Sequence, residues 1–284
     1  MVYLLLTAAV LCVTVQNLIA KQYNASVKNP NTYMFSSLVA ASAMVFFLII
    51  NGGKFKFVPE TAGYSLSFAA MYSMAMIGNV MAINCGPLAI STLINQCTLI
   101  IPTLYGIFAL KENLSAVGYL GIVLVFVCLF LVKPQTKEGD AKVSPKWFAW
   151  VATGFVGNGM CSTIQKMQQL KFGGAYKSEF MTVALAVGAL VMFASACLSS
   201  KSITADIASA IKYAPFEGAA NGGLNMLVML LTSLVPTAIL FPVVMSGGVV
   251  ITFIASVTLF KEKLAAKQLV GYVLGALSIV LINL

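Results

Sequence analysis

Apolar runs of about 20 residues recur along the whole 284-residue chain, and short polar gaps separate them. A helix of that length reaches across the roughly 30 Å hydrocarbon core of a bilayer. Hydrophobic residues make up 60% of the chain and charged residues 9%, whereas a soluble domain carries roughly 25% charged residues. Because so few charges cannot cover a water-facing surface, we predict an integral membrane protein.

The net charge of +9 comes from lysines, which lie mostly in the gaps between the apolar runs. Lysines in such positions contact anionic lipid headgroups, so we expect the lipid bilayer as a partner and no nucleic acid. The six cysteines stand singly within apolar runs, without a CxxC pair. This spacing predicts packing roles, with no disulfide framework and no metal site.

The runs predict an all-α polytopic membrane protein, because they lack the ten-residue alternation of a membrane barrel. The polar stretch 133–146 divides the chain into a first five-helix unit at 1–132, a linker, and a second five-helix unit at 147–284. The segment 202–215 is expected to form a helix lying flat on the membrane surface. The ten expected spans are 2–22, 33–51, 62–84, 87–110, 114–132, 147–168, 178–198, 214–234, 237–260 and 264–283.

The two units resemble each other at an offset of 150 residues. Residues 108–131 read FALKENLSAVGYLGIVLVFVCLFL, residues 258–281 read TLFKEKLAAKQLVGYVLGALSIVL, and Glu112 therefore corresponds to Glu262. An odd number of helices per unit makes the second unit enter the membrane from the opposite side. The pattern predicts an inverted repeat, which is typical of secondary transporters with a substrate site near the membrane midplane.

A duplicated five-helix unit that closes on Glu-x-Leu and a glycine-bearing helix resembles the drug/metabolite transporter (DMT) superfamily, and within it the EamA-type transporters. The residues that carry this resemblance are Pro102, Glu112, Leu114, Gly121, Glu262, Leu264 and Gly271. The second half departs from the pattern at Thr252, which stands where the first half has Pro102. The resemblance implies a central cavity between helices one to four and six to nine, with the fifth and tenth helices at the periphery.

The tenth helix carries Gly271-x-x-x-Gly275, a spacing that permits close helix contact. Two interpretations stand side by side. The glycines pack against the helix's own bundle, which leaves a monomer, or they form a homodimer face.

Three polar residues share one face of the helix at 214–234, because Glu217, Asn221 and Asn225 are spaced four residues apart. Asn225 lies about 15 Å into this helix, close to the middle of a bilayer. Polar side chains at that depth usually face a bundle interior or a water-filled cavity. We expect these three residues to bind substrate; the alternative is an interhelical hydrogen bond that only holds the bundle together.

Other helices offer further candidates for substrate contact. Asn95 and Gln96 are adjacent, so at most one of them faces the cavity. The remaining candidates are Tyr72, Asn17 and Ser246.

Two lysines occupy matching positions in the two halves, Lys21 in LIAKQ and Lys166 in TIQKM. They are expected either to bind anions at the cavity mouths or to reach the interface as ordinary lysines. Glu179 is a candidate partner for Lys166 or Lys177 in a gate.

No enzyme motif is present: the chain has no histidine, no Walker GxxxxGK[ST] and no GxSxG. We expect no enzymatic activity and no cofactor. The acids lie in gaps or near helix ends, so solute exchange or facilitated diffusion is expected, with Glu217 as the one candidate for proton coupling.

The sequence therefore favours a multi-pass secondary transporter of small organic metabolites, neutral, zwitterionic or anionic and amino-acid-like, in a plasma membrane, the bacterial cytoplasmic membrane being favoured. Efflux of drugs or organic cations is the first alternative. A non-transporting membrane receptor or assembly subunit is the second.

Overall fold

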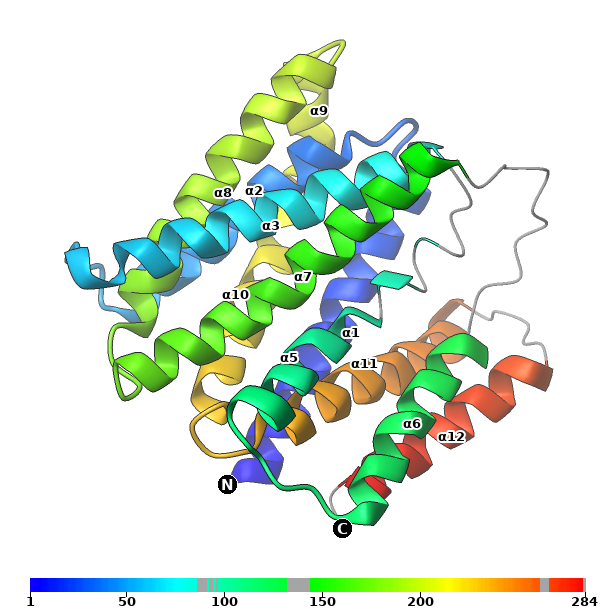
Figure 1. Cartoon of the computed structure of the whole chain (residues 1–284). Helices are drawn as coiled ribbons and strands as arrows, with labels where there is room; N and C mark the ends of the chain where they lie inside the picture. The colour runs from blue at the N-terminus through cyan, green and yellow to red at the C-terminus, as the bar shows by residue number, and fades with distance from the viewer. Residues whose placement is uncertain (86–90, 92–93, 96, 132–143, 261–265, 283–284) are drawn as a thin grey trace.

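The computed structural model describes residues 1–85, 91, 94–95, 97–131, 144–260 and 266–282, and regular structure in this part of the chain is helical, without strands. Figure 1 shows the helices as one layered bundle, with the first and last described residues toward the same end. The elements are α1 (Val2–Ser26), α2 (Thr32–Ile50), α3 (Pro59–Cys85), η1 (Cys97–Leu99), α5 (Ile100–Leu104), η2 (Tyr105–Ala109), α6 (Ala116–Leu131), α7 (Pro145–Lys171), α8 (Lys177–Ser199), α9 (Ile203–Ala210), α10 (Ala214–Leu231), α11 (Thr237–Phe260) and α12 (Ala266–Ile282).

These elements fall on the apolar runs of the sequence, and the segment 202–215 contains the separate short helix α9. Four helices, α1, α2, α3 and α8, are long and apolar enough to cross a membrane by length and composition. Shorter apolar stretches accompany them at Cys97–Ala109, Ala116–Cys128, Thr237–Thr252 and Leu269–Ile282. This architecture fits an α-helical membrane protein.

The predicted helix 87–110 is irregular where the structure describes it. A 3₁₀ turn (η1) leads into the five-residue helix α5, and a π-helical turn (η2) follows. Pro102 lies in α5 and has no backbone N–H to donate, which interrupts the regular hydrogen-bond ladder. Residues 97–109 are nevertheless helical without a break, as predicted, and the π turn leads into the loop at Glu112.

Side chains fix two helix starts close to where the sequence placed them. Asn31 accepts a hydrogen bond from the backbone N–H of Met34 at 3.2 Å and caps α2. Ser144 accepts one from Trp147 at 3.1 Å and caps α7, whose first residue is Pro145. Both are favourable arrangements at a helix N-terminus.

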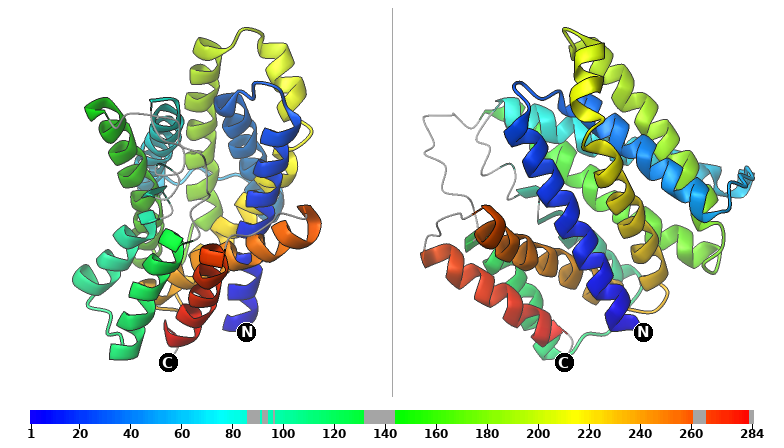
Figure 2. Two further views of the ribbon diagram at one scale, coloured as in Figure 1. Left: turned by 90° about the vertical axis from the view of Figure 1, so that its right-hand side faces the viewer. Right: turned by 180° about the vertical axis from the view of Figure 1, so that it is seen from behind.

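The helices of the two halves pack across each other rather than in separate bundles. Helix α1 of the first half packs against α10 and α11 of the second half. Helix α7 of the second half packs against α3 and α5 of the first half. Helix α2 packs against α8 and α10, and α8 against α2 and α3. Helices α6 and α12 lie side by side along one flank, as Figures 1 and 2 show. The contact between the halves is thus formed mainly by α1, α2 and α3 of the first half and α7, α8 and α10 of the second.

Small residues set the closeness of the α3–α7 contact. A Cβ added at Gly154 would lie 2.3 Å from Oδ1 of Asn79, and one at Gly157 would lie 2.6 Å from the backbone nitrogen of Ala75. Helix α7 can therefore approach α3 at these turns only because its residues there lack side chains.

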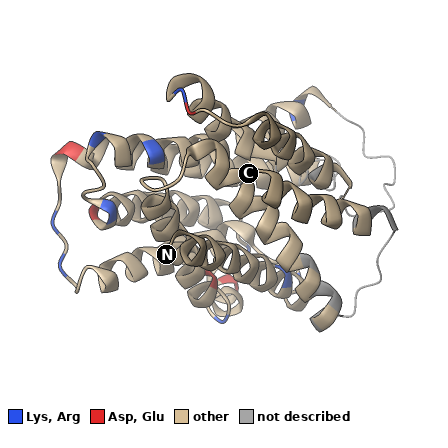
Figure 3. Ribbon diagram, turned by 90° about the horizontal axis from the view of Figure 1, so that it is seen from below, with Lys and Arg blue, Asp and Glu red and all other residues tan. Residues whose placement is uncertain are grey.

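The outer surface is apolar along the length of the helices. Leu4, Ile49, Leu190 and Leu198 are 76%, 71%, 69% and 91% exposed. Figure 3 shows most charged residues in loops or near helix ends. A belt of exposed apolar side chains with charges toward its edges suits contact with lipid.

Candidate functional site

A chain of four amide side chains crosses the bundle interior. Asn221 of α10 donates to Oε1 of Gln16 on α1 at 2.9 Å. Asn225, one turn along α10, donates to Oδ1 of Asn221 at 2.9 Å and accepts from Gln165 of α7 at 2.6 Å. The network therefore links the first half, through Gln16, with two helices of the second half.

The face of α10 that carries these amides is set by the glycines on its other side. A Cβ at Gly218 would lie 2.4 Å from Cβ of Ser42, and one at Gly222 would lie 2.5 Å from the ring of Phe46, both on α2. Because the glycine face packs on α2, the face with Asn221 and Asn225 turns toward α1 and α7.

Glu217 lies on the amide face of α10, one turn before Asn221. It is half-buried, and its Oε2 atom is fully buried without a hydrogen-bond partner among the described residues. Tyr72 of α3 is close enough to interact electrostatically with both Glu217 and Cys161 of α7. The ring of Tyr72 lies nearly parallel to that of Phe68, with 6.3 Å between the ring centroids. This aromatic pair, which we call the aromatic wall, lies near the carboxylate.

The second polar junction lies at the opposite end of α10. Nζ of Lys166 lies 3.7 Å from Oε1 of Glu112 and donates to the carbonyl oxygen of Thr232 at 2.6 Å. Oε2 of Glu112 accepts from the backbone N–H of Ala238 at 2.9 Å, at the start of α11. The two charged side chains are only 7% and 12% exposed.

This junction, which we call the Glu112–Lys166 clamp, joins three parts of the chain. Glu112 comes from the loop after η2, Lys166 from α7, and the two backbone groups from the α10–α11 connection. Its carboxylate also stabilises the helix dipole at the N-terminus of α11. Gly106 leaves room for it, since a Cβ there would lie 2.4 Å from Oε2 of Glu112.

The other sequence-predicted residues are spread over several places. Asn17 is exposed and donates to Thr252 of α11 at 3.2 Å, away from the amide chain. Ser246 is fully buried and donates to the carbonyl oxygen of Pro242 in its own helix at 2.6 Å. Asn95 is half-buried, and Gln96 lies outside the described residues.

The predicted gate residues also lie in different parts of the structure. Lys21 is half-buried near the end of α1, and Glu179 is half-buried in the first turn of α8. The ion pair that the structure gives Lys166 goes to Glu112, not to Glu179. Lys177 donates instead to the carbonyl oxygen of Gly174.

Gln165 is missing from the sequence-predicted site, as is the pairing of Glu112 with Lys166. Gln165 stands among other buried amides in QKMQQ, and only its bond to Asn225 distinguishes it. The sequence does contain a pattern that indicates the pairing: lysines at matching positions in the two halves, and glutamates that match at the offset of 150 residues. Opposite charges repeated in both halves of an apolar chain favour pairs between them.

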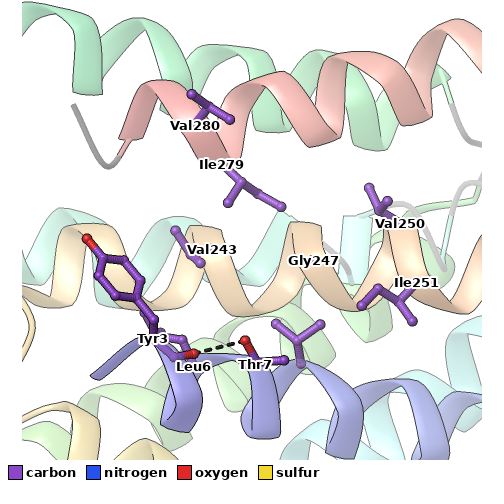
Figure 4. Close-up of a pocket in the computed structure, with 10 residues that line it drawn as sticks. Tyr3, Leu6, Thr7, Val243, Gly247, Val250, Ile251, Ile279 and Val280 are labelled. Atoms are coloured by element: carbon purple, nitrogen blue, oxygen red, sulfur yellow. Dashed lines mark hydrogen bonds between the residues drawn. The ribbon is translucent and has the colours of Figure 1, made fainter. Parts of the chain in front are cut away.

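A separate apolar groove of about 460 Å³ lies between α1, α11 and α12. Figure 4 shows Val243, Gly247 and Ile279 along it, and the hydroxyl of Thr7 bonded to the carbonyl oxygen of Tyr3 at 2.9 Å. None of the residues named for the amide chain or the clamp lines it. Its lining suits an acyl chain better than a polar solute.

The polar groups assembled here are amides, single carboxylates and one ion pair. Within the described part of the chain, no three or more Cys, Asp or Glu side chains cluster in a way that would hold a metal ion. The arrangement can orient a polar solute by hydrogen bonds and one charge.

Comparison with known proteins adds information on the fold alone. The sequence matches no protein-family profile and no curated protein. One solved structure, described only as "Crystal structure of protein", superposes with a TM-score of 0.75 at 12% sequence identity. The match covers 100% of this chain and 98% of that one, so the whole chain shares its fold with a protein of known structure.

Proposed function

We propose that this protein is a secondary transporter of small organic solutes, built as an inverted repeat of the DMT type and working by alternating access. The observation that carries the proposal is the amide chain Gln16–Asn221–Asn225–Gln165, which joins the two halves inside an apolar bundle. Amides buried in a lipid-facing protein are costly unless they serve packing or a polar pathway. Four of them in one connected chain favour a pathway.

The exchange of packing partners supports the inverted repeat. Under the correspondence α1 with α7, α2 with α8, α3 with α10 and α5 with α11, the pairing of α1 with α10 and α11 becomes that of α7 with α3 and α5. Likewise α2 with α10 becomes α8 with α3. This correspondence agrees with the 150-residue repeat and suits a site between the two halves.

In the proposed cycle the Glu112–Lys166 clamp holds one end of the bundle closed. The amide chain lies on the inner side of this closed end, along α10 and α7, and Glu217 lies nearer the other end. Solute enters from the Glu217 end, exchanges hydrogen bonds with the amides, and leaves when the clamp opens. Coupling is by solute gradient or exchange, and the membrane is a plasma membrane.

A second candidate is efflux of organic cations. It is favoured by Glu217 lying near the aromatic pair Tyr72 and Phe68, since a carboxylate and aromatic faces together attract positive charge. It needs the same fold and the same pathway, and differs only in the solute.

Counterflow into liposomes tests transport itself. Purified protein is reconstituted with a high internal concentration of each amino acid in turn, and uptake of a radiolabelled trace from outside is followed. We expect transient accumulation for at least one solute, without an imposed pH gradient. Asn221→Ala and Asn225→Ala should each slow it by about tenfold or more, because a lost hydrogen bond leaves a buried amide unpaired.

Asn17→Ala is the matched control, because Asn17 is an exposed amide on α1 that bonds Thr252 outside the amide chain. It should retain the wild-type rate. If both α10 variants fold and transport at the wild-type rate, the amide pathway is wrong. If amino acids, organic cations and small solutes without an amino group all fail to show counterflow, the protein belongs with the non-transporting membrane proteins.

A further inference from the structure

The buried carboxylate oxygen of Glu217 has no hydrogen-bond partner among the described residues, whereas the four amides of the neighbouring chain all have one. Asn221, Asn225, Gln16 and Gln165 are all hydrogen-bonded. Oε2 of Glu217 is fully buried and unpaired among the described residues. A buried acceptor without a donor costs free energy. The state of the protein in which a donor reaches Glu217 is therefore stabilised relative to this one.

The surroundings of Glu217 restrict what that donor is. Tyr72 of α3 is close enough to interact electrostatically with Glu217, and it carries no positive charge. The cation of the clamp is engaged elsewhere, with Glu112 and Thr232 near the far end of α7. No described lysine is paired with Glu217, so its charge is left for a cation that comes from outside the protein.

We propose that Glu217 binds the positively charged amino group of the transported solute, a step that rests on the transport function proposed above. An ammonium group donates strong charge-assisted hydrogen bonds to a carboxylate. Tyr72 and Phe68 supply aromatic surface, which favours a positive group. The hydrogen bonds to Glu217 thereby compensate for the hydration that the amino group loses on entering the bundle.

The spacing along α10 places hydrogen-bonding groups beside this position. Asn221 follows one turn later, about 6 Å along the helix axis, and Asn225 about 12 Å along it. Both are amides, which donate to a carboxylate and accept from a hydroxyl or an amide. An amino-acid-like zwitterion would set its ammonium at Glu217 and its carboxylate toward Asn221. An organic amine without a carboxylate would use Glu217 and the aromatic wall alone.

Thermal stabilisation of the purified protein in lipid nanodiscs tests the assignment. The probes are the standard amino acids in three forms: free, as methyl esters that keep the amine, and N-acetylated, which removes its charge. The amino-group assignment predicts stabilisation by free or esterified forms of at least one amino acid, and binding about tenfold weaker or more after N-acetylation. Stabilisation by the free form alone indicates a zwitterion, and by both forms an organic amine.

Variants connect the preference to the carboxylate. Glu217→Gln keeps the shape and removes the charge, and it should bind free and N-acetylated forms equally weakly. Glu60→Gln is the matched control, because Glu60 is an exposed acid in the first turn of α3; it should behave as wild type. Glu217→Asp, should Glu217→Gln not fold, keeps the charge one methylene farther back and should bind more weakly while preserving the preference for the free amine.

The inference is overturned if N-acetylated forms stabilise the wild type as well as free forms do, if Glu217→Gln keeps the preference, or if no amine in the panel binds. Its failure is distinguishable from failure of the transport function. Counterflow of a solute without an amino group, unaffected by Glu217→Gln, leaves the transporter and removes the amino-group assignment. Amine binding that needs Glu217, in a protein with no counterflow, keeps the amino-group assignment and removes the transport function.

Discussion

Lys166 illustrates how a single charged residue is retained in an apolar bundle. Its ammonium donates to the carbonyl oxygen of Thr232 and lies 3.7 Å from Glu112, whose other oxygen is held by the N–H of Ala238. Each charge therefore has a backbone partner as well as its counter-ion. A pair arranged in this way can be broken and re-formed without leaving either group wholly unpaired, which suits a closing contact better than a permanent brace.

At the residue scale, a double-mutant cycle tests the coupling of the pair. Glu112→Gln and Lys166→Met should each cost roughly 1.5–3 kcal/mol of stability, because each leaves one buried charge without its counter-ion. The double variant should cost less than the two combined, since neither charge remains. The measurement is the apparent melting temperature in nanodiscs.

Lys171→Met serves as the control for this cycle, because Lys171 is an exposed lysine at the end of the same helix. Its melting temperature should stay at the wild-type value. Strictly additive losses for Glu112→Gln and Lys166→Met would show that the two groups act independently, and the clamp would then be only a pair of helix-end contacts.

At the scale of elements, the α3–α7 contact determines which side chains of α7 reach the interior. Gly154 and Gly157 lie against α3, and Gln165 and Lys166 follow two to three turns later on the same helix. The close contact fixes the rotation of α7 about its axis, because side chains at those positions would push the helices apart. Gln165 is thereby turned toward Asn225 and Lys166 toward Glu112.

Two glycine-to-alanine variants separate packing from helix propensity. Gly157→Ala should destabilise by about 1–3 kcal/mol, because its Cβ would lie 2.6–2.7 Å from backbone atoms of α3. Gly63→Ala, on α3 with no atom within 4 Å of its added Cβ, should stabilise by up to about 1 kcal/mol through helix propensity. Melting temperatures should move in opposite directions; a fall in both would contradict the expected gain in helix propensity at Gly63.

The irregular stretch from η1 to η2 has a related role. Its π turn ends at Ala109, and the N–H of Glu112 then bonds the carbonyl oxygen of Gly106 at 3.0 Å. This local geometry brings the Glu112 carboxylate over the start of α11. The π turn at the end of the predicted helix therefore contributes to the position of the clamp.

At the scale of the whole molecule, the two halves interlock. Helix α1 belongs to the first half and packs on α10 and α11, while α7 belongs to the second and packs on α3 and α5. Gly275 of α12 packs against Cys128 of α6, with a Cβ there reaching 2.7 Å from its sulfur. The second glycine of Gly271-x-x-x-Gly275 thus packs within its own bundle, and both the monomer and the homodimer stay predictions.

The proposed inverted topology predicts opposite labelling of two equivalent positions. Asn113, which follows Glu112, corresponds at the offset of 150 residues to Lys263, which lies outside the described residues. Single cysteines are placed at these positions in a background with the exposed Cys197 changed to serine. In intact cells, a membrane-impermeant maleimide should label one of the two cysteines and not the other. Permeabilised cells, in which both should react, provide the control. Reaction of both from the same side would remove the inverted repeat.

The sequence by itself determined where the helices lie and that several of them are apolar enough to cross a membrane. Apolar runs long enough for a bilayer, separated by short gaps, are a local property that needs no tertiary contact, and the helices fall on them. The spacing of Glu217, Asn221 and Asn225 likewise gave a polar helix face, since helical periodicity alone decides it. Residues 97–109 are helical as the hydrophobic pattern predicts, but they form 3₁₀, α and π turns in succession, and Pro102 lies in the α turn.

Only the tertiary structure decided which polar groups meet. Lys166 could not be matched to Glu112, 54 residues earlier, nor Asn225 to Gln165, 60 residues earlier, without knowing how helices rotate and cross. Asn17 and Gln16 are neighbours in sequence, yet one bonds Thr252 at the surface and the other Asn221 in the interior. Helix rotation depends on close contacts such as Gly157 against α3 and Gly218 against α2, which form only when distant segments pack together.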